Sequence, residues 1–130
     1  MADPEAFLKP PGVRRMKSYS SETGYVYQYY FVEMRRARRR GIPCDGTEYI
    51  FAVSSDRKTT FDLPIFLRQD CLDDWAREHG RALTGTEQYG VAKMRLFRAF
   101  DEIEELAKQR MNIVVDLSNL GDLLDQLGIA

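Results

Sequence analysis

The spacing of the apolar side chains changes once along this chain, near Asp70, and this change limits the folds that the chain can adopt. Before Asp70 the apolar residues alternate with a period of two, as in β-strands, whereas after it they recur at intervals of three and four, as in amphipathic helices. Strands that precede all the helices are typical of an α+β protein. We therefore expect a two-layer α+β fold, in which an N-terminal antiparallel β-meander of about three strands is covered by about three C-terminal helices.

The length and composition indicate one domain. A chain of 130 residues of which 44% are hydrophobic has enough apolar surface for a single core. Residues 1–12 contain three prolines and a glycine, so we expect a flexible arm there. Residues 13–130 are expected to form the domain, with a sheet half at 13–68 and a helical half at 70–130.

Three stretches of the sheet half predict strands. Residues 24–32, which a short stretch at 13–19 leads into, place four aromatic side chains on one side of a strand: Tyr25, Tyr27, Tyr29 and Phe31. We expect this aromatic face to lie on a helical layer. Residues 48–54 are apolar on both sides, which predicts a central strand covered on both faces. Residues 60–67 contain Pro64, which lacks a ladder N–H, so this strand is expected at an edge of the sheet.

Three amphipathic stretches of the helical half predict helices. The first, at 70–79, has Asp70 as its expected N-cap and a glycine after its end. The second, at 84–110, begins with the capping box Thr-x-x-Glu and continues as one apolar stripe. After an extended link at 113–115, the last stretch closes the chain with a row of leucines: Leu117, Leu120, Leu124 and Leu127. We expect this last helix to dock on its own domain, with self-association as the alternative.

The densest positive charge follows directly on the aromatic strand and defines the candidate binding surface. Its members are Tyr27, Tyr29, Arg35, Arg36, Arg38, Arg39 and Arg40. One hypothesis is contact with an unknown protein partner or with a second copy of the chain. A second is that the arginines hold the phosphates of a single-stranded nucleic acid while the rings stack on its bases. A third needs no ligand: the arginines keep a hairpin edge from pairing with other chains, or they pair with acids such as Glu102, Glu104 and Glu105.

The distribution of charge favours a protein partner over nucleic acid. Residues 1–40 carry nine Lys or Arg against four Asp or Glu, whereas residues 41–130 carry ten against sixteen. The acidic helical half would repel a nucleic-acid strand wherever the strand passes it. Nucleic-acid binding at the hairpin therefore stays the weaker alternative.

The sequence carries no catalytic, cofactor or metal signature. His79 is the only histidine, and beside Trp75 near a helix end we expect it to pack or to cap. The aspartates at 70–74 lack the spacing and the glycine of a calcium loop, and Cys44 and Cys71 lack a zinc-type pair spacing. We expect no cofactor, no metal and no catalysis, the alternative being a small enzyme whose residues converge from distant positions.

The sequence also bears on the location of the protein. No secretory apolar segment follows Met1, and no apolar run approaches the roughly 18–20 residues that a membrane span needs. We expect a cytoplasmic protein with reduced thiols and no membrane contact. Together these patterns predict a small binding or adaptor domain that acts through protein–protein contacts near the basic aromatic hairpin.

Overall fold

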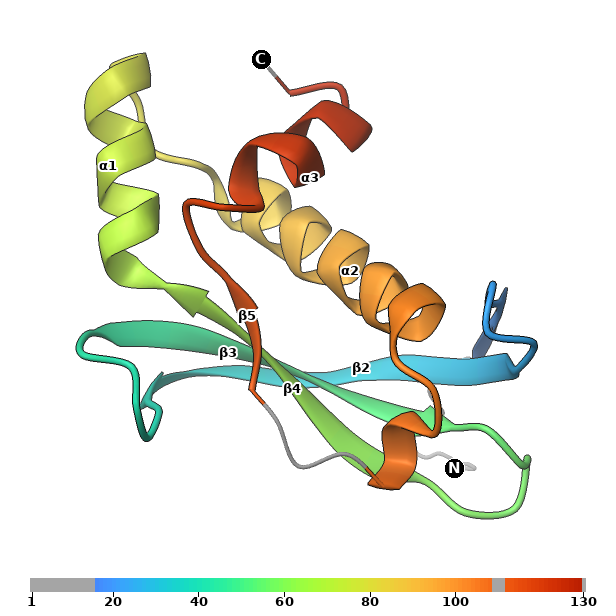
Figure 1. Cartoon of the computed structure of the whole chain (residues 1–130). Helices are drawn as coiled ribbons and strands as arrows, with labels where there is room; N and C mark the ends of the chain where they lie inside the picture. Colours follow the sequence, from blue (N-terminus) through green and yellow to red (C-terminus); the bar gives the residue numbers. More distant parts are fainter. Residues whose placement is uncertain (1–15, 109–111, 130) are drawn as a thin grey trace, which may run out of the picture.

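The computed structural model describes residues 16–108 and 112–129, which form an α+β fold with one sheet and helices on one of its faces (Figure 1). The strands are β1 (Lys17–Ser20), β2 (Val26–Arg38), β3 (Asp45–Ser54), β4 (Phe61–Arg68) and β5 (Ile113–Val115). The helices are α1 (Gln69–His79), α2 (Gly85–Glu102) and α3 (Leu120–Gln126), with a short 3-10 helix, η1, at Leu106–Lys108. The α+β class is confirmed, and the sheet has more strands than expected. The arm expected at 1–12 lies outside the described residues.

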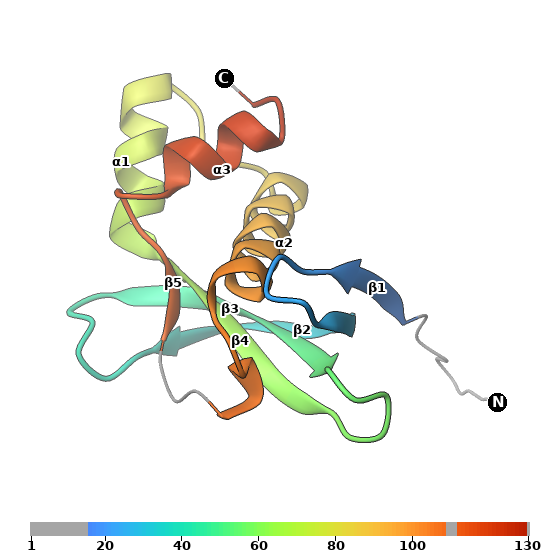
Figure 2. The same ribbon diagram turned by 45° about the vertical axis from the view of Figure 1, so that its right-hand side comes forward.

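The sheet has the order β1-β2-β3-β4-β5, and its first four strands form an antiparallel meander (Figure 2). Strand β3 lies in the middle and is buried at every position after Asp45, which confirms the expectation of a central strand covered on both faces. Strand β5 runs parallel to β4 and adds a fifth strand from the helical half of the chain.

The edge position expected for β4 is wrong over half of the strand. Residues Ile65, Phe66 and Leu67 pair with β5, so only the first part of β4, up to Pro64, lies at the edge of the sheet among the described residues. Pro64 lacks an N–H, so it cannot donate a ladder hydrogen bond itself, but the residues after it can still pair with a neighbouring strand. The stretch 113–115, expected to be only a link, is the strand that covers β4.

The aromatic face of β2 packs on α2, as the alternation predicts, except that Tyr25 precedes the strand and is exposed. The ring of Tyr27 stacks on Phe100 with centroids 4.3 Å apart, and Tyr29 meets Phe97 edge-on at 5.5 Å. Tyr19 of β1 stacks on Phe97 at 4.4 Å and donates a hydrogen bond of 2.7 Å from its hydroxyl to Asp101. Offset and edge-on ring contacts add to the free energy gained by burying the apolar area. These contacts attach the first two strands to the helical layer.

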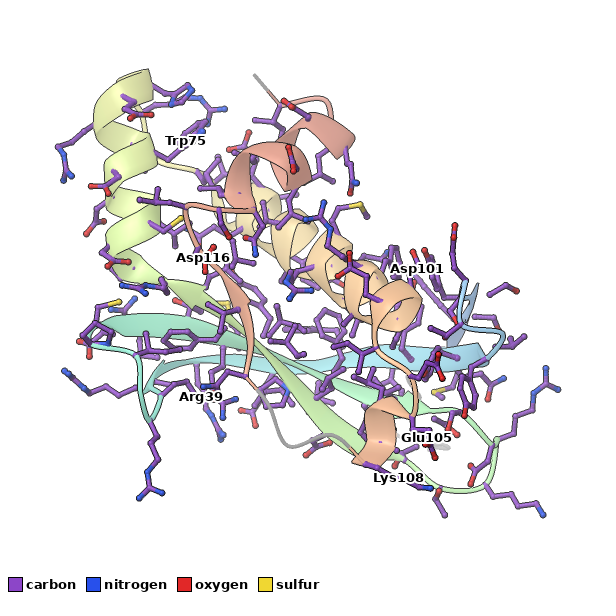
Figure 3. The ribbon with its side chains drawn as sticks, viewed as in Figure 1. Arg39, Trp75, Asp101, Glu105, Lys108 and Asp116 are labelled. Carbon is purple, nitrogen blue, oxygen red and sulfur yellow. The ribbon has the colours of Figure 1, made fainter. Side chains whose placement is uncertain are left out.

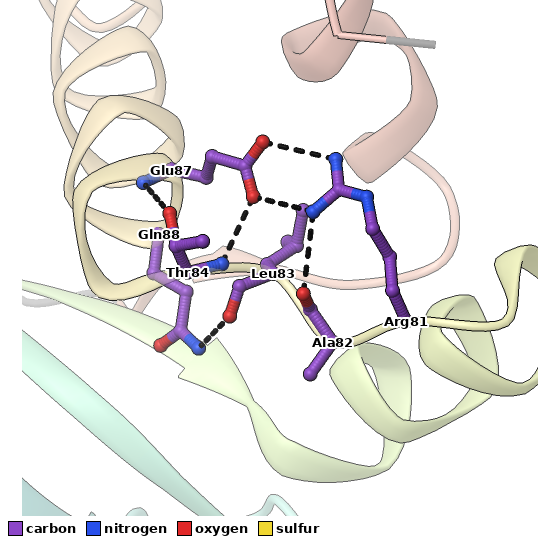
Figure 4. A network of polar contacts seen from close by, with 6 residues as sticks. All are labelled: Arg81, Ala82, Leu83, Thr84, Glu87 and Gln88. Atoms are coloured by element: carbon purple, nitrogen blue, oxygen red, sulfur yellow. Dashed lines mark hydrogen bonds and ion pairs between the residues drawn. The ribbon is translucent and has the colours of Figure 1, made fainter.

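The start of α2 has the expected capping box (Figure 4). The hydroxyl of Thr84 accepts the N–H of Glu87 at 3.1 Å, and Oε1 of Glu87 accepts the N–H of Thr84 at 2.9 Å. Arg81 adds two hydrogen bonds to the same carboxylate, of 2.8 and 3.0 Å. The two side-chain oxygens of the box satisfy two backbone N–H groups that a helix start leaves without intrahelical partners.

The other end of α2 differs from the expectation. The helix ends at Glu102 instead of continuing to about residue 110; Ile103 is extended, and Glu105 adopts a φ of 51°. Carboxylates are unfavourable at the C-terminal, negative end of a helix dipole, and four of them gather here within residues 101–105. The last turn has no basic residue to offset them. The acidic cluster was therefore a usable stop signal, although the chain has neither Gly nor Pro at this point.

The starts of α1 and α3 also differ. The N-cap of α1 is Arg68, two residues before the expected Asp70, and Asp70 lies in the first turn, where its carboxylate binds Arg68. Its C-terminal glycine, Gly80, is confirmed by a φ of 72°. Helix α3 begins at Leu120, so Leu117 lies outside the helix and is exposed.

Helix α3 docks on its own domain, as expected. Leu120, Leu123 and Leu124 are buried in the common core, and Leu127 packs against it. The carbonyl of Val114 in β5 accepts hydrogen bonds from Arg95 of α2 and from Asn119, the residue before α3. These two bonds hold β5 between α2 and the start of α3.

The capping network predicts a pH dependence of stability. Hydrogen bonds from Arg81 and from the Thr84 N–H lower the pKa of Glu87 from 4.5 to about 2. A carboxylate whose pKa is depressed by folding stabilises the protein above its unfolded pKa and loses that contribution as the pH falls through the folded value. We expect Glu87→Gln to lower the thermal midpoint at neutral pH. The difference from wild type should shrink below pH 4.5 and vanish near pH 2; a difference that does not change with pH would contradict this.

The close approach of β3 and β4 predicts a position that tolerates only glycine. A Cβ atom at Gly46 would overlap the carbonyl oxygen of Leu67 and the ring of Phe66. We expect Gly46→Ala to lower the free energy of unfolding by about 1–3 kcal/mol, measured by urea denaturation. Gly85→Ala is the matched control: its Cβ would meet nothing within 4 Å, and alanine favours the helix it begins. Equal stability of the two variants would show that the strands do not approach in this way.

Candidate functional site

A β-bulge decides which way each arginine of β2 points. The pairing of β2 with β3 shifts register between Phe31 and Glu33, so β2 contains one extra residue there. A shift of one residue moves every later side chain to the opposite face of the strand. Before the bulge the odd-numbered residues face the helices, and after it the even-numbered ones do: Met34 pairs with Tyr49, a core residue beneath α2.

Two of the five arginines hold a buried carboxylate on the face away from the helices. Glu48 of β3 has a side chain that is only 5% exposed. The Nε atom of Arg35 donates to Oε1 at 3.1 Å, and Nε of Arg39 lies 2.5 Å from Oε2. The Arg39 contact does not have the angle of a hydrogen bond, but its short distance makes it an ion pair, because attraction between charges depends mainly on separation. We call this arrangement the Glu48 clamp; Figure 3 labels Arg39.

The clamp gives Arg35 and Arg39 a structural role, so their positive charge does not need a ligand to explain it. A buried carboxylate is costly unless opposite charges and hydrogen bonds compensate it. Of the acids expected to pair with the arginines, Glu105 binds Lys108 instead, at 2.7 Å; both residues are labelled in Figure 3. The arginines of β2 contact Glu48 and Asp45 of β3 and Gln69 at the start of α1. Sequence reasoning missed Glu48, although a single carboxylate at the start of the apolar run EYIFAV was a visible signal.

The helix-side face of β2 presents a different set of residues beyond the bulge. Met34 is 57% exposed, and Arg36 and Arg38 follow it at every second position. Nη1 of Arg36 donates to Gln69 Oε1 at 2.7 Å, and Nη1 of Arg38 donates to Asp45 Oδ1 at 2.9 Å. The Arg38 side chain is 70% exposed, so it offers further donors to solvent. We call Met34, Arg36 and Arg38 the exposed ladder.

The remaining members of the predicted surface lie apart from the ladder. Tyr27 and Tyr29 are 1% and 5% exposed and belong to the core, so their rings are not accessible for stacking on a base. Their burial follows from the alternation itself, which turns both rings toward α2. Arg40 is exposed in the turn after β2, and its carbonyl accepts a hydrogen bond of 3.4 Å from Asn112.

His79 takes the packing and capping role expected of it. Its ring stacks on Trp75 with centroids 4.1 Å apart, and its Nδ1 lies 2.9 Å from the Trp75 carbonyl oxygen. Asp74, an acid on the same helix, forms an ion pair with Arg77. The groove beside His79 is lined in the described part of the chain by no serine, threonine or cysteine. Among the described residues, His79 therefore has no side-chain nucleophile beside it in this groove.

The remaining candidate ligands are separated as well. Asp70 binds Arg68 and Asp73 accepts a hydrogen bond from Gln69, and no cluster able to hold a metal ion occurs among residues 16–108 and 112–129. Both cysteines are free, and burial raises the pKa of the Cys71 thiol to about 12. A thiol with a raised pKa is a poor nucleophile. Within the same described ranges, no helix has the length and apolarity needed to cross a membrane.

Comparisons with known proteins add no identification. No protein-family model matches the chain, and neither a curated protein nor a solved structure matches it significantly.

The Glu48 clamp predicts that neighbouring arginines differ in their effect on stability. Arg39→Ala should lower the free energy of unfolding by about 1–3 kcal/mol, because it leaves the buried Glu48 carboxylate undercompensated. Arg38→Ala removes an arginine side chain at the neighbouring position, where it forms only an exposed ion pair with Asp45. It should change the free energy of unfolding by less than about 0.5 kcal/mol. Urea denaturation measures both. Equal losses at the two positions would mean that Glu48 does not depend on the clamp.

Proposed function

We propose that this protein is a non-catalytic binding or adaptor domain that contacts an acidic segment of a protein partner through the exposed ladder. The observation that carries the proposal is the division of the arginines by the bulge in β2. Arg35 and Arg39 are committed to Glu48, whereas Arg36 and Arg38 stand on the other face beside an exposed methionine.

The chemistry of the ladder suits carboxylate recognition. A guanidinium group is planar and offers paired N–H donors that match the two oxygens of a carboxylate. Met34 adds an apolar surface that adapts to different side chains. The strand that carries the ladder is paired with β3 as far as Arg38, so little conformational entropy is lost on binding.

A protein partner fits these residues better than a nucleic acid does. Stacking on bases would require accessible rings, and Tyr27 and Tyr29 are buried. Carboxylates also lie within the arginine hairpin: Glu33 precedes the arginines on β2, and Asp45 and Glu48 lie opposite them on β3. These groups lower the positive potential that phosphates would meet. Nucleic-acid binding is therefore the weaker alternative, and nuclease treatment separates the two.

Charge reversal on the ladder tests the proposal. Immobilised protein is exposed to lysate of its own cells, with and without nuclease treatment, and captured proteins are compared between wild type and the double variant Arg36→Glu/Arg38→Glu. We expect wild type to retain proteins with acidic segments and the double variant to lose them. Arg57→Glu/Lys58→Glu is the matched control, since it makes the same charge change in the exposed β3–β4 loop, and it should retain them.

Two outcomes would contradict the proposal. Capture that is unchanged in the ladder variant would show that the ladder is not the contact surface. Capture that disappears with nuclease would instead indicate nucleic acid. In that case the affinity for a single-stranded oligonucleotide should fall linearly in a log–log salt plot, with a slope of about −0.7 for each phosphate contacted.

A further inference from the structure

Helices α1 and α3 border an open groove on the side of the molecule where α1 rises away from the end of β4 (Figure 1). The groove has a volume of about 260 Å³. Trp75, Leu120 and Leu124, all nearly buried, form its apolar floor, and Glu78 and Asp125 line it with carboxylates. Figure 3 labels Trp75 on α1, on the side that faces α3.

An exposed leucine stands at the mouth of this groove. Leu117 is 67% exposed, the highest value among the large hydrophobic side chains of the described residues. It lines both this groove and a neighbouring hollow of about 320 Å³ next to Arg68 and Asp70. Burial of this exposed leucine by a partner would lower the free energy, because apolar surface would be removed from water.

A tight turn holds Leu117 in this position. Oδ1 of Asp116, labelled in Figure 3, accepts the N–H of Ser118 at 2.9 Å, and the N–H of Asp116 donates to Oδ1 of Asn119 at 3.0 Å. Asn119 in turn donates from Nδ2 to the carbonyl of Val114 in β5. The turn is thus tied to the sheet, and Leu117 is presented to solvent by ordered backbone.

Two carboxylates line the groove, Glu78 of α1 and Asp125 of α3, and among the described residues no lysine or arginine does. Arg81 lies outside this lining, with its guanidinium carbon 5.2 Å from the centroid of the Trp75 ring. Within the described part of the chain, neither Glu78 nor Asp125 has an ion-pair partner. Carboxylates around an apolar floor create a negative potential that attracts a cation to the place where an apolar group can also bind.

We propose that this groove binds a short extended segment of another protein in which a large apolar side chain stands next to lysine or arginine. The apolar side chain packs against Leu117 and Leu124, beside Trp75, whose ring is already stacked on His79 and lies 5.2 Å from the guanidinium carbon of Arg81. The basic side chain reaches Glu78 and Asp125. This site shares no residue with the exposed ladder and selects the opposite charge. Either proposal can therefore fail without the other.

The only tryptophan of the chain provides the readout, because Trp75 forms the floor of the groove. The probe is a displayed library of random peptides without tryptophan, selected on the full-length protein. We expect the enriched peptides to carry Lys or Arg beside Leu, Met or Phe. A synthetic peptide of the enriched sequence should shift the emission of Trp75 in a saturable way.

Variants of the groove test the assignment. Glu78→Lys/Asp125→Lys should weaken the peptide affinity about tenfold or more, and Leu117→Ser should weaken it by about tenfold through the lost apolar contact. The matched control Glu33→Lys/Asp62→Lys makes the same charge change on exposed strand residues that do not line this groove. It should leave the affinity within about twofold, because solvent and salt screen distant charges.

Three results would overturn the proposal. The first is a library from which no peptide gives saturable binding, or from which acidic peptides are enriched. The second is an equal loss of affinity in the control variant. The third is a Trp75 shift that appears with protein concentration alone and accompanies self-association in sedimentation, since the occupant would then be a second copy of the chain.

Discussion

The packing of the aromatic face of β2 on α2 is the interaction on which the rest of the structure depends. Tyr27 and Tyr29 meet Phe100 and Phe97 at the centre of the core, and Tyr19 joins them from β1. Large rings bury more apolar area than other side chains, so this contact fixes where the helical layer lies on the sheet. The remaining elements arrange themselves around it: β3 and β4 extend the sheet, and β5 and α3 close the far side of α2.

The register shift at the end of that face gives the arginine run its two roles. Side chains on the helix side after the bulge point into solvent because α2 does not cover them, and those on the other side meet Glu48. Positive charge in a sequence therefore does not measure positive charge available to a ligand. The proposed ladder consists of the arginines of β2 that do not bind Glu48, together with Met34. The proposed peptide groove lies on α1 and α3, so the two proposed contact sites are separate.

Local patterns predicted local features well, and long-range features poorly. The change of period near Asp70 predicted strands followed by helices, and the Thr84 capping box predicted the start of α2. Strand β5 is too short, at three residues, to show a period. The bulge adds a single residue and leaves no periodic signal of its own. The clamp joins residues that only strand pairing brings together, so knowing the partner of Glu48 required the register of β2 on β3.

Side-chain footprinting with hydroxyl radicals tests the central claim most directly, because it measures the accessibility of individual residues in the native protein. The claim is that β2 turns its aromatic rings into the core before the bulge and its even-numbered residues toward solvent after it. We predict rapid oxidation of Met34 and of the partly exposed Tyr25, and protection of Tyr27 and Tyr29 until the protein unfolds. Native oxidation of Tyr27 and Tyr29 as fast as that of Tyr25, with Met34 protected, would contradict the account.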